Sequence, residues 1–163
     1  MQIFAQHATV VSRSDLAPAA QAHLLRQALE REIVERLACG EADAALEARL
    51  TDALARQEAT GTLTDADCVE FIEADQAFHQ AMYVALGLEA LWTLVRRQSG
   101  HIDRLHLPEA GKAASVLRQH EAVAAAIARR DPAAARATLR EHLGGTLGRI
   151  DEIRRLYPES VTG

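Results

Sequence analysis

The sequence is poor in aromatic side chains, in cysteine and in long apolar runs. Its 163 residues include one Trp, two Tyr and three Phe, and only two cysteines, Cys39 and Cys68. Two isolated cysteines exclude a disulfide framework and a thiolate metal site, and we interpret them as reduced thiols of a cytoplasmic protein. No stretch approaches the roughly 18 apolar residues of a membrane span. The N-terminus also lacks the basic start and apolar run of a signal peptide.

The sequence also lacks an excess of basic residues over acidic ones. The formal net charge is −5, which argues against a nucleic-acid-binding surface on this chain. Apolar residues make up 48% of the sequence, Ala and Leu dominate, and the nine glycines and four prolines fall mostly between periodic segments. This composition favours helices packed on helices. We therefore predict an all-α fold, an antiparallel bundle of six to seven helices.

Apolar periodicity and helix-breaking residues delimit the expected helices. They predict six, over residues 15–39, 41–58, 65–87, 88–105, 112–130 and 132–157. Asp131 followed by Pro132 is a clear restart, an N-cap residue followed by proline at the first helical position. Residues 1–19 are β-prone at first and then polar, so we expect a strand and linker there that docks on the helices or on another chain.

Four ionisable residues stand where the apolar stripes of these helices require hydrophobic ones. They are Asp75, His79, His120 and His142. A buried carboxylate and three imidazoles are costly without partners. The same set is a plausible ligand shell for a divalent transition-metal ion.

Spacing indicates that the four residues converge. Asp75 and His79 are four residues apart and share one helix face. His120 lies eleven residues before Asp131 and His142 eleven after it. If the last two helices form a hairpin that turns near Asp131, both imidazoles lie roughly 16 Å from the turn at 1.5 Å per residue. The sequence therefore predicts a metal or ligand site between facing helices of a bundle.

Simpler interpretations remain open for each residue taken singly. A lone histidine on an apolar face is usually a hydrogen-bonded core residue, and an Asp–His pair at this spacing is often an ordinary surface pair. The remaining histidines lie in the linker, the early first helix or beside a loop, and we interpret them as non-ligands: His7, His23, His101 and His106.

Longer strings around these residues resemble a known family. The chain resembles the FadR-type C-terminal effector domain (FCD domain) of GntR-family transcription regulators from about residue 20 onward. The combination D-x-x-F-H, then H-E in a helix middle, then E-H-L after a D-x-x-x-A turn is fairly specific. The strings are LLRQALEREIVERLA (24–38), EADQAFHQAMYVALG (73–87), RRQSGHIDRLHLPEAGKA (96–113), RQHEAVAAAIARRDPAAARATLREHL (118–143) and GTLGRIDEIRRLYP (145–158).

The resemblance implies an all-helical domain that binds a small metabolite and signals to a winged helix-turn-helix. It implies that Asp75, His79, His120 and His142 coordinate a divalent ion, zinc or nickel, either as a structural ion or as an anchor for a carboxylate effector. Effectors of the family are typically organic acids and sugar acids, and such regulators generally dimerise.

The resemblance also divides the chain. Residues 1–19 look like the last strand of the wing and its linker, residues 20–158 like the effector-binding and dimerisation domain, and residues 159–163 like a tail. We therefore expect the chain to lack most of the winged helix-turn-helix, and expect full-length DNA binding to depend on that missing domain.

Two arginines are candidates for binding an effector carboxylate beside the ion. Arg26 belongs to the LRQALE segment, and Arg97 is roughly level with the Asp75–His79 pair across the Gly87 turn. Most arginines on such helices face solvent, which is the competing interpretation of both.

A metal-dependent hydrolase and a purely structural or dimerisation module are the alternatives. A hydrolase needs a general base near the metal-bound water. No second glutamate or further histidine occupies a stripe position near the four residues, and Glu121 and Glu141 are offset by one residue, about 100° around the helix. We therefore predict a sensor and not an enzyme.

Overall fold

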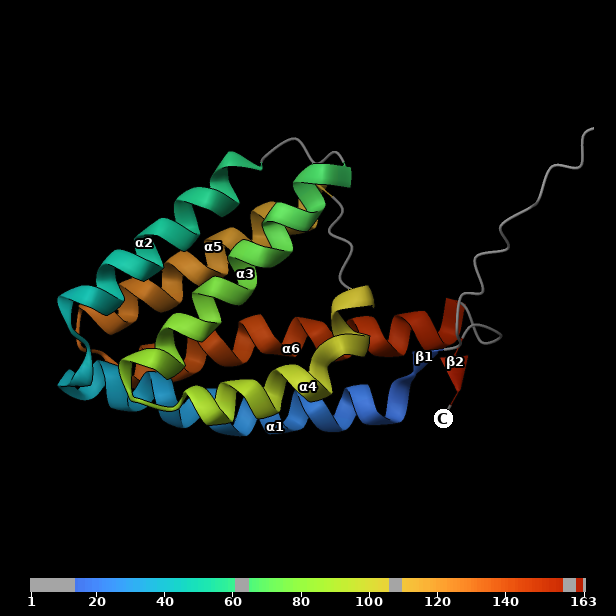
Figure 1. Ribbon diagram of the computed structural model, residues 1–163, viewed down its shortest axis with the longest axis horizontal. Coiled ribbons are helices and arrows are strands. Elements are labelled where there is room, and N and C mark those ends of the chain that lie inside the picture. The colour runs from blue at the N-terminus through green and yellow to red at the C-terminus, as the bar shows by residue number, and fades with distance from the viewer. Residues whose placement is uncertain (1–13, 61–64, 106–109, 157–160, 163) are drawn as a thin grey trace, which may run out of the picture.

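The computed structural model is an all-α bundle, which confirms the predicted fold class (Figure 1). It describes residues 14–60, 65–105, 110–156 and 161–162, and the side chains of residues 20–60, 69–97, 113–145 and 155. Six α-helices follow one another: α1 (Leu16–Arg36), α2 (Ala44–Ala59), α3 (Asp65–Ala85), α4 (Glu89–Leu105), α5 (Ala110–Ala128) and α6 (Pro132–Leu156). A π-helical turn, η1 (Leu37–Glu41), follows α1.

Two short strands lie near the ends of the described chain. β1 (Ser14–Asp15) pairs in parallel with β2 (Val161–Thr162). The apolar segment expected to form a wing strand falls on residues 1–13, outside the described residues. Among the described residues, no helix combines the length and apolar character that a bilayer span requires.

The helices form two groups that the α5–α6 hairpin connects. In Figure 1, α2, α3 and α5 lie together above α1, α4 and α6. Helix α2 packs against α3 and α5, and α1 packs against α4 and α6. Since α5 belongs to one group and α6 to the other, side chains from both groups meet along the hairpin.

Helix boundaries follow local sequence signals. Gly40 has a φ of 114°, a conformation that suits glycine, and it ends the first helical segment where the sequence predicted a stop. Asp43 then caps α2, since its Oδ1 accepts a hydrogen bond of 2.8 Å from the backbone N–H of Leu46. In the same way, Asp131 Oδ1 accepts a 2.9 Å bond from the N–H of Ala134, which confirms the predicted restart before α6.

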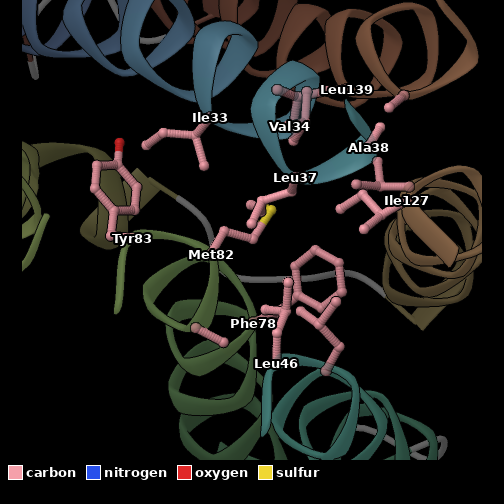
Figure 2. Packing of buried hydrophobic residues seen from close by; sticks show 14 of the residues in the cluster. Ile33, Val34, Leu37, Ala38, Leu46, Phe78, Met82, Tyr83, Ile127 and Leu139 are labelled. Carbon is pink, nitrogen blue, oxygen red and sulfur yellow. The ribbon is translucent and has the colours of Figure 1, made fainter. Parts of the chain in front are cut away.

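The apolar core lies where α1, α3 and the α5–α6 hairpin approach one another. Phe78 and Met82 of α3 point toward Leu37 of η1 in Figure 2, and all three are fully buried. Ile127 of α5 and Leu139 of α6 complete this cluster from the hairpin. The core thus fixes α3 against the hairpin and sets the level at which their polar side chains meet.

Candidate metal centre

The four residues that interrupt the apolar stripes meet at one point in the bundle. Asp75 and His79 come from α3, His120 from α5 and His142 from α6, and one nitrogen or oxygen of each lies within 4.8 Å of the corresponding atoms of the others. His79 and His120 are fully buried, whereas Asp75 and His142 are partly exposed. The predicted convergence of the four residues is therefore present in the structure.

The three imidazoles approach one another through the same ring atom. Nε2 of His142 lies 3.2 Å from Nε2 of His79 and 3.1 Å from Nε2 of His120. Oδ1 of Asp75 lies 3.5 Å from Nε2 of His120. The contact between His120 and His142 confirms that the α5–α6 hairpin brings these two side chains to the same level.

These separations suit ligands that share one ion. Two nitrogen atoms, each about 2.05 Å from a zinc ion, lie roughly 3.3 Å apart at the tetrahedral angle and about 2.9 Å apart at a right angle. The observed Nε2–Nε2 distances of 3.1 and 3.2 Å fall between these values. Imidazole nitrogen and carboxylate oxygen are also donor types that zinc and nickel accept.

Polar side chains behind the rings set which nitrogen carries the proton. Nδ1 of His120 donates a 2.9 Å hydrogen bond to Oε1 of Gln57, and Nδ1 of His142 donates a 3.2 Å bond to Oε1 of Gln119. In a neutral imidazole only one nitrogen carries a proton. Both Nε2 atoms are therefore left with a lone pair that faces the cluster.

His79 has a carboxylate behind it. Its Nδ1 lies 2.8 Å from Oε2 of Glu30, and both side chains are fully buried. A negative oxygen at this distance favours a proton on Nδ1 and a lone pair on Nε2. Three lone pairs thus converge on one point beside a carboxylate, an arrangement that a cation stabilises and that outer acceptors commonly support in metal sites.

Burial keeps two of the imidazoles neutral. It lowers the pKa of His120 well below its ordinary value of 6.5, and the neighbouring His142 lowers it further. Burial, followed by the nearby His79, lowers the pKa of His142 to about 3. His142 is partly exposed as a residue, but its ring nitrogens face Gln119 and the cluster. Near neutral pH both rings are therefore available as neutral ligands.

The two arginines that the sequence analysis named as effector-binding candidates lie in different surroundings. Nε of Arg26 lies 2.8 Å from Oε1 of Glu30, and the Arg26 side chain is 13% exposed. Because Oε2 of the same Glu30 lies 2.8 Å from Nδ1 of His79, this guanidinium is connected to the cluster through one carboxylate. Arg97 is exposed on α4, and the described contacts do not connect it to the four residues. The effector-binding roles of Arg26 and Arg97 both stay predictions.

The sequence analysis missed the supporting residues Glu30, Gln57 and Gln119. Gln57 continues the buried line of Leu46, Leu50 and Ala53 on α2, so its position on an apolar stripe was a usable signal. Glu30 lies seven residues after His23 on α1, so the two share one face of the helix, and both are fully buried. Buried polar residues at this spacing were a signal for a polar environment on that face. Leu25 and Leu29, two apolar residues of the same helix, are only partly buried.

The expectation that no second glutamate occupies a stripe position near the four residues was wrong, because Glu30 is fully buried beside His79. Glu30 contacts His79, and although burial alone would raise its pKa, Arg26 and His79 lower that pKa to about 2. Glu30 contacts the Nδ1 side of the ring, however, whereas the cluster is on the Nε2 side. Glu121 and Glu141 are exposed, as their one-residue offset predicted.

The other candidate groups whose side chains the structure describes lie outside the cluster. His23 is fully buried on α1 and is not a member of the four-residue group, and its interpretation as a non-ligand stays a prediction. Cys39 is an exposed free thiol. The side chains of Cys68, His7, His101 and His106 lie outside those that the structure describes.

Comparison with known proteins agrees with the architecture. The sequence model of the FCD domain matches residues 21–145. The chain is also 35% identical, over 162 residues, to an uncharacterized HTH-type transcriptional regulator in an unstable DNA locus of Streptomyces ambofaciens. That alignment covers 98% of this chain and 66% of the relative, so the chain spans slightly less than two thirds of the relative's length. The match over most of its residues shows that the chain belongs to the FCD domain family.

Proposed function

We propose that this chain is the ligand-sensing domain of a GntR-type transcription regulator, and that it binds a divalent metal ion and a small carboxylate metabolite. The observation that carries the proposal is the convergence of three imidazole Nε2 atoms and one carboxylate in the bundle. Asp75, His79, His120 and His142 would hold the ion, and zinc or nickel suits this donor set. The ion would supply a positive centre for an anionic ligand.

The charges around the cluster favour an anionic effector. Arg26 and Glu30 form a buried ion pair whose charges cancel, and Asp75 offsets one of the two charges of a divalent ion. One positive charge then remains at the site, which attracts the carboxylate of an organic acid or sugar acid. Arg26 is the better placed of the two candidate arginines to contact that carboxylate, because it is mostly buried and pairs with Glu30, which contacts His79, whereas Arg97 is exposed.

The coupling to DNA requires a further domain. The Streptomyces relative is an HTH-type regulator and is longer than this chain, which supports a winged helix-turn-helix in the whole protein. We propose that effector binding changes the packing of the helices and so the spacing of two DNA-binding domains in a homodimer. A cytoplasmic location follows from such a role.

An enzymatic role is less well supported by the site. A hydrolase requires a general base within hydrogen-bonding reach of the metal-bound water. Glu30 contacts the outer nitrogen of His79 and pairs with Arg26, so its two oxygens are directed away from the cluster. The family to which the chain belongs also supports regulation and not catalysis.

A thermal-shift screen of organic and sugar acids, with and without zinc, tests the proposal. We expect at least one acid to raise the melting temperature only when zinc is present, because the ion supplies part of the binding site. An acid that stabilises the chelated protein equally would contradict metal-assisted binding. Turnover of a stabilising acid would favour the enzyme instead.

Matched variants make the screen specific. His142→Asn removes a proposed ligand, whereas Glu141→Gln changes its exposed neighbour on α6. Arg26→Gln removes the proposed carboxylate contact, and Arg31→Gln changes an exposed arginine of the same helix. We expect the first variant of each pair to lose the rise in melting temperature that the acid causes in the presence of zinc. The second variant of each pair should retain that rise.

A further inference from the structure

Glu30 contacts both a proposed metal ligand, His79, and the neighbouring Arg26. It lies on α1, a helix that contributes none of the four proposed ligands, and its side chain is fully buried. Oε1 lies 2.8 Å from Nε of Arg26, and Oε2 lies 2.8 Å from Nδ1 of His79. Oε1 thus forms an ion pair with a residue outside the proposed ligand set, and Oε2 lies within ion-pair distance of a residue inside it.

The support behind His79 differs from that behind the other two rings. His120 and His142 are backed by the neutral amides of Gln57 and Gln119, whereas His79 is backed by a charged carboxylate. The negative oxygen of Glu30 lies 2.8 Å from Nδ1 of His79, so its charge favours a proton on that nitrogen more than the oxygen of a neutral amide would. It also increases the electron density on Nε2, which makes the ring a better ligand.

We propose that Glu30 is the positioning residue of the metal site: it holds His79 as the Nδ1–H tautomer with Nε2 facing the ion, and its other oxygen fixes Arg26 beside the same site. This inference rests on the proposed function. It adds a fifth residue on which the affinity for the metal depends, although that residue does not touch the ion. It also links the orientation of a metal ligand to that of the guanidinium that faces the effector.

Zinc affinity of Glu30→Gln tests the proposal. The amide keeps the size of the side chain and removes its charge, so we expect zinc to bind about 10- to 100-fold more weakly, the usual loss when such an outer partner is removed. Competition with a chromophoric chelator measures the dissociation constant. Glu32→Gln, at an exposed position on the same helix, is the control and should bind zinc within about twofold of the wild type.

A second variant deals with the charge that Glu30→Gln leaves unpaired. Removing one partner of a buried ion pair destabilises a protein strongly, because the other charge stays buried. The double variant Arg26→Gln/Glu30→Gln removes both charges, and Arg26→Gln alone is its reference. We expect the double variant to bind zinc at least about tenfold more weakly than Arg26→Gln.

The ring nitrogens of His79 provide a readout that a purely structural role would not change. In metal-free wild type, ¹⁵N chemical shifts should report a protonated Nδ1 and an unprotonated Nε2, and in Glu30→Gln the shifts should move toward a mixture of tautomers. Unchanged shifts or an unchanged zinc affinity would each overturn the role of Glu30 and leave the proposed function standing. If the wild-type protein binds no zinc, the proposed function is contradicted, and so is the role of Glu30 in metal binding.

Discussion

Acid should destabilise the metal-free protein well above the pH at which ordinary carboxylates titrate. In the folded protein, His120 and His142 are kept neutral because burial lowers the pKa of each below 6.5. In the unfolded chain both are free to take up a proton near pH 6.5. The folded state thus binds fewer protons than the unfolded state as the pH falls, and stability that is present above pH 6.5 is lost below it.

The size of the effect follows from these two groups. A histidine that is neutral in the folded state and titrates normally in the unfolded state reduces the free energy of unfolding by roughly 2 kcal/mol between pH 7 and pH 5. For His120 and His142 together the loss is about 4 kcal/mol, a large part of the 5–15 kcal/mol that domains typically possess. Glu30, with its pKa of about 2, adds to the loss in the same direction only as the pH falls through about 4.5.

Urea unfolding of chelated protein at several pH values between 5 and 7 measures the effect. We expect the extrapolated free energy of unfolding to decrease steadily over this range, and we expect His142→Gln to show about 2 kcal/mol less dependence, because one titrating group is gone. Glu141→Gln is the matched control and should keep the full dependence. A free energy that is constant between pH 5 and pH 7 would refute the conclusion that these imidazoles are buried and neutral.

Three further predictions concern stability and its link to the metal. Zinc at about 100 times its dissociation constant should raise the free energy of unfolding by about 2.7 kcal/mol. Calorimetry should then show a melting temperature roughly 5–11 °C higher than in a chelator; no shift would contradict binding to the folded state. Asp131→Ala removes the cap on the N–H of Ala134 and should cost about 1 kcal/mol in urea unfolding, with zinc affinity unchanged. Leu139→Ala opens a cavity at a fully buried position and should cost about 2–5 kcal/mol; a loss under 1 kcal/mol would contradict the packing of α6.

Much of the fold could be predicted because its signals are local. Gly40, Gly87 and Asp131 each end or restart a helix through the conformation or hydrogen bonding of one residue, and the structure has a helix boundary at each. The π-helical turn over Leu37–Glu41 was not predicted. Apolar periodicity predicts where a helical segment lies, but it does not distinguish a widened last turn from a regular one.

The four clustered residues could be predicted for a related reason. Each interrupts an apolar stripe on its own helix, and equal spacing about Asp131 brings His120 to the level of His142. The partnership of Glu30 with His79 depends instead on how α1 packs against α3, which no local pattern encodes. A supporting residue on a helix that contributes no proposed ligand, such as Glu30 of α1, therefore escaped the sequence analysis.

X-ray absorption spectroscopy of protein loaded with one equivalent of zinc tests the central claim most directly. We predict about three imidazole nitrogens and a carboxylate oxygen at roughly 2.0–2.2 Å from the ion, and the loss of one imidazole in His120→Asn. Sulfur scattering from Cys39 would show that the ion does not bind where α3, α5 and α6 meet. A spectrum with fewer than two imidazoles, unchanged in His120→Asn, would lead to the same conclusion.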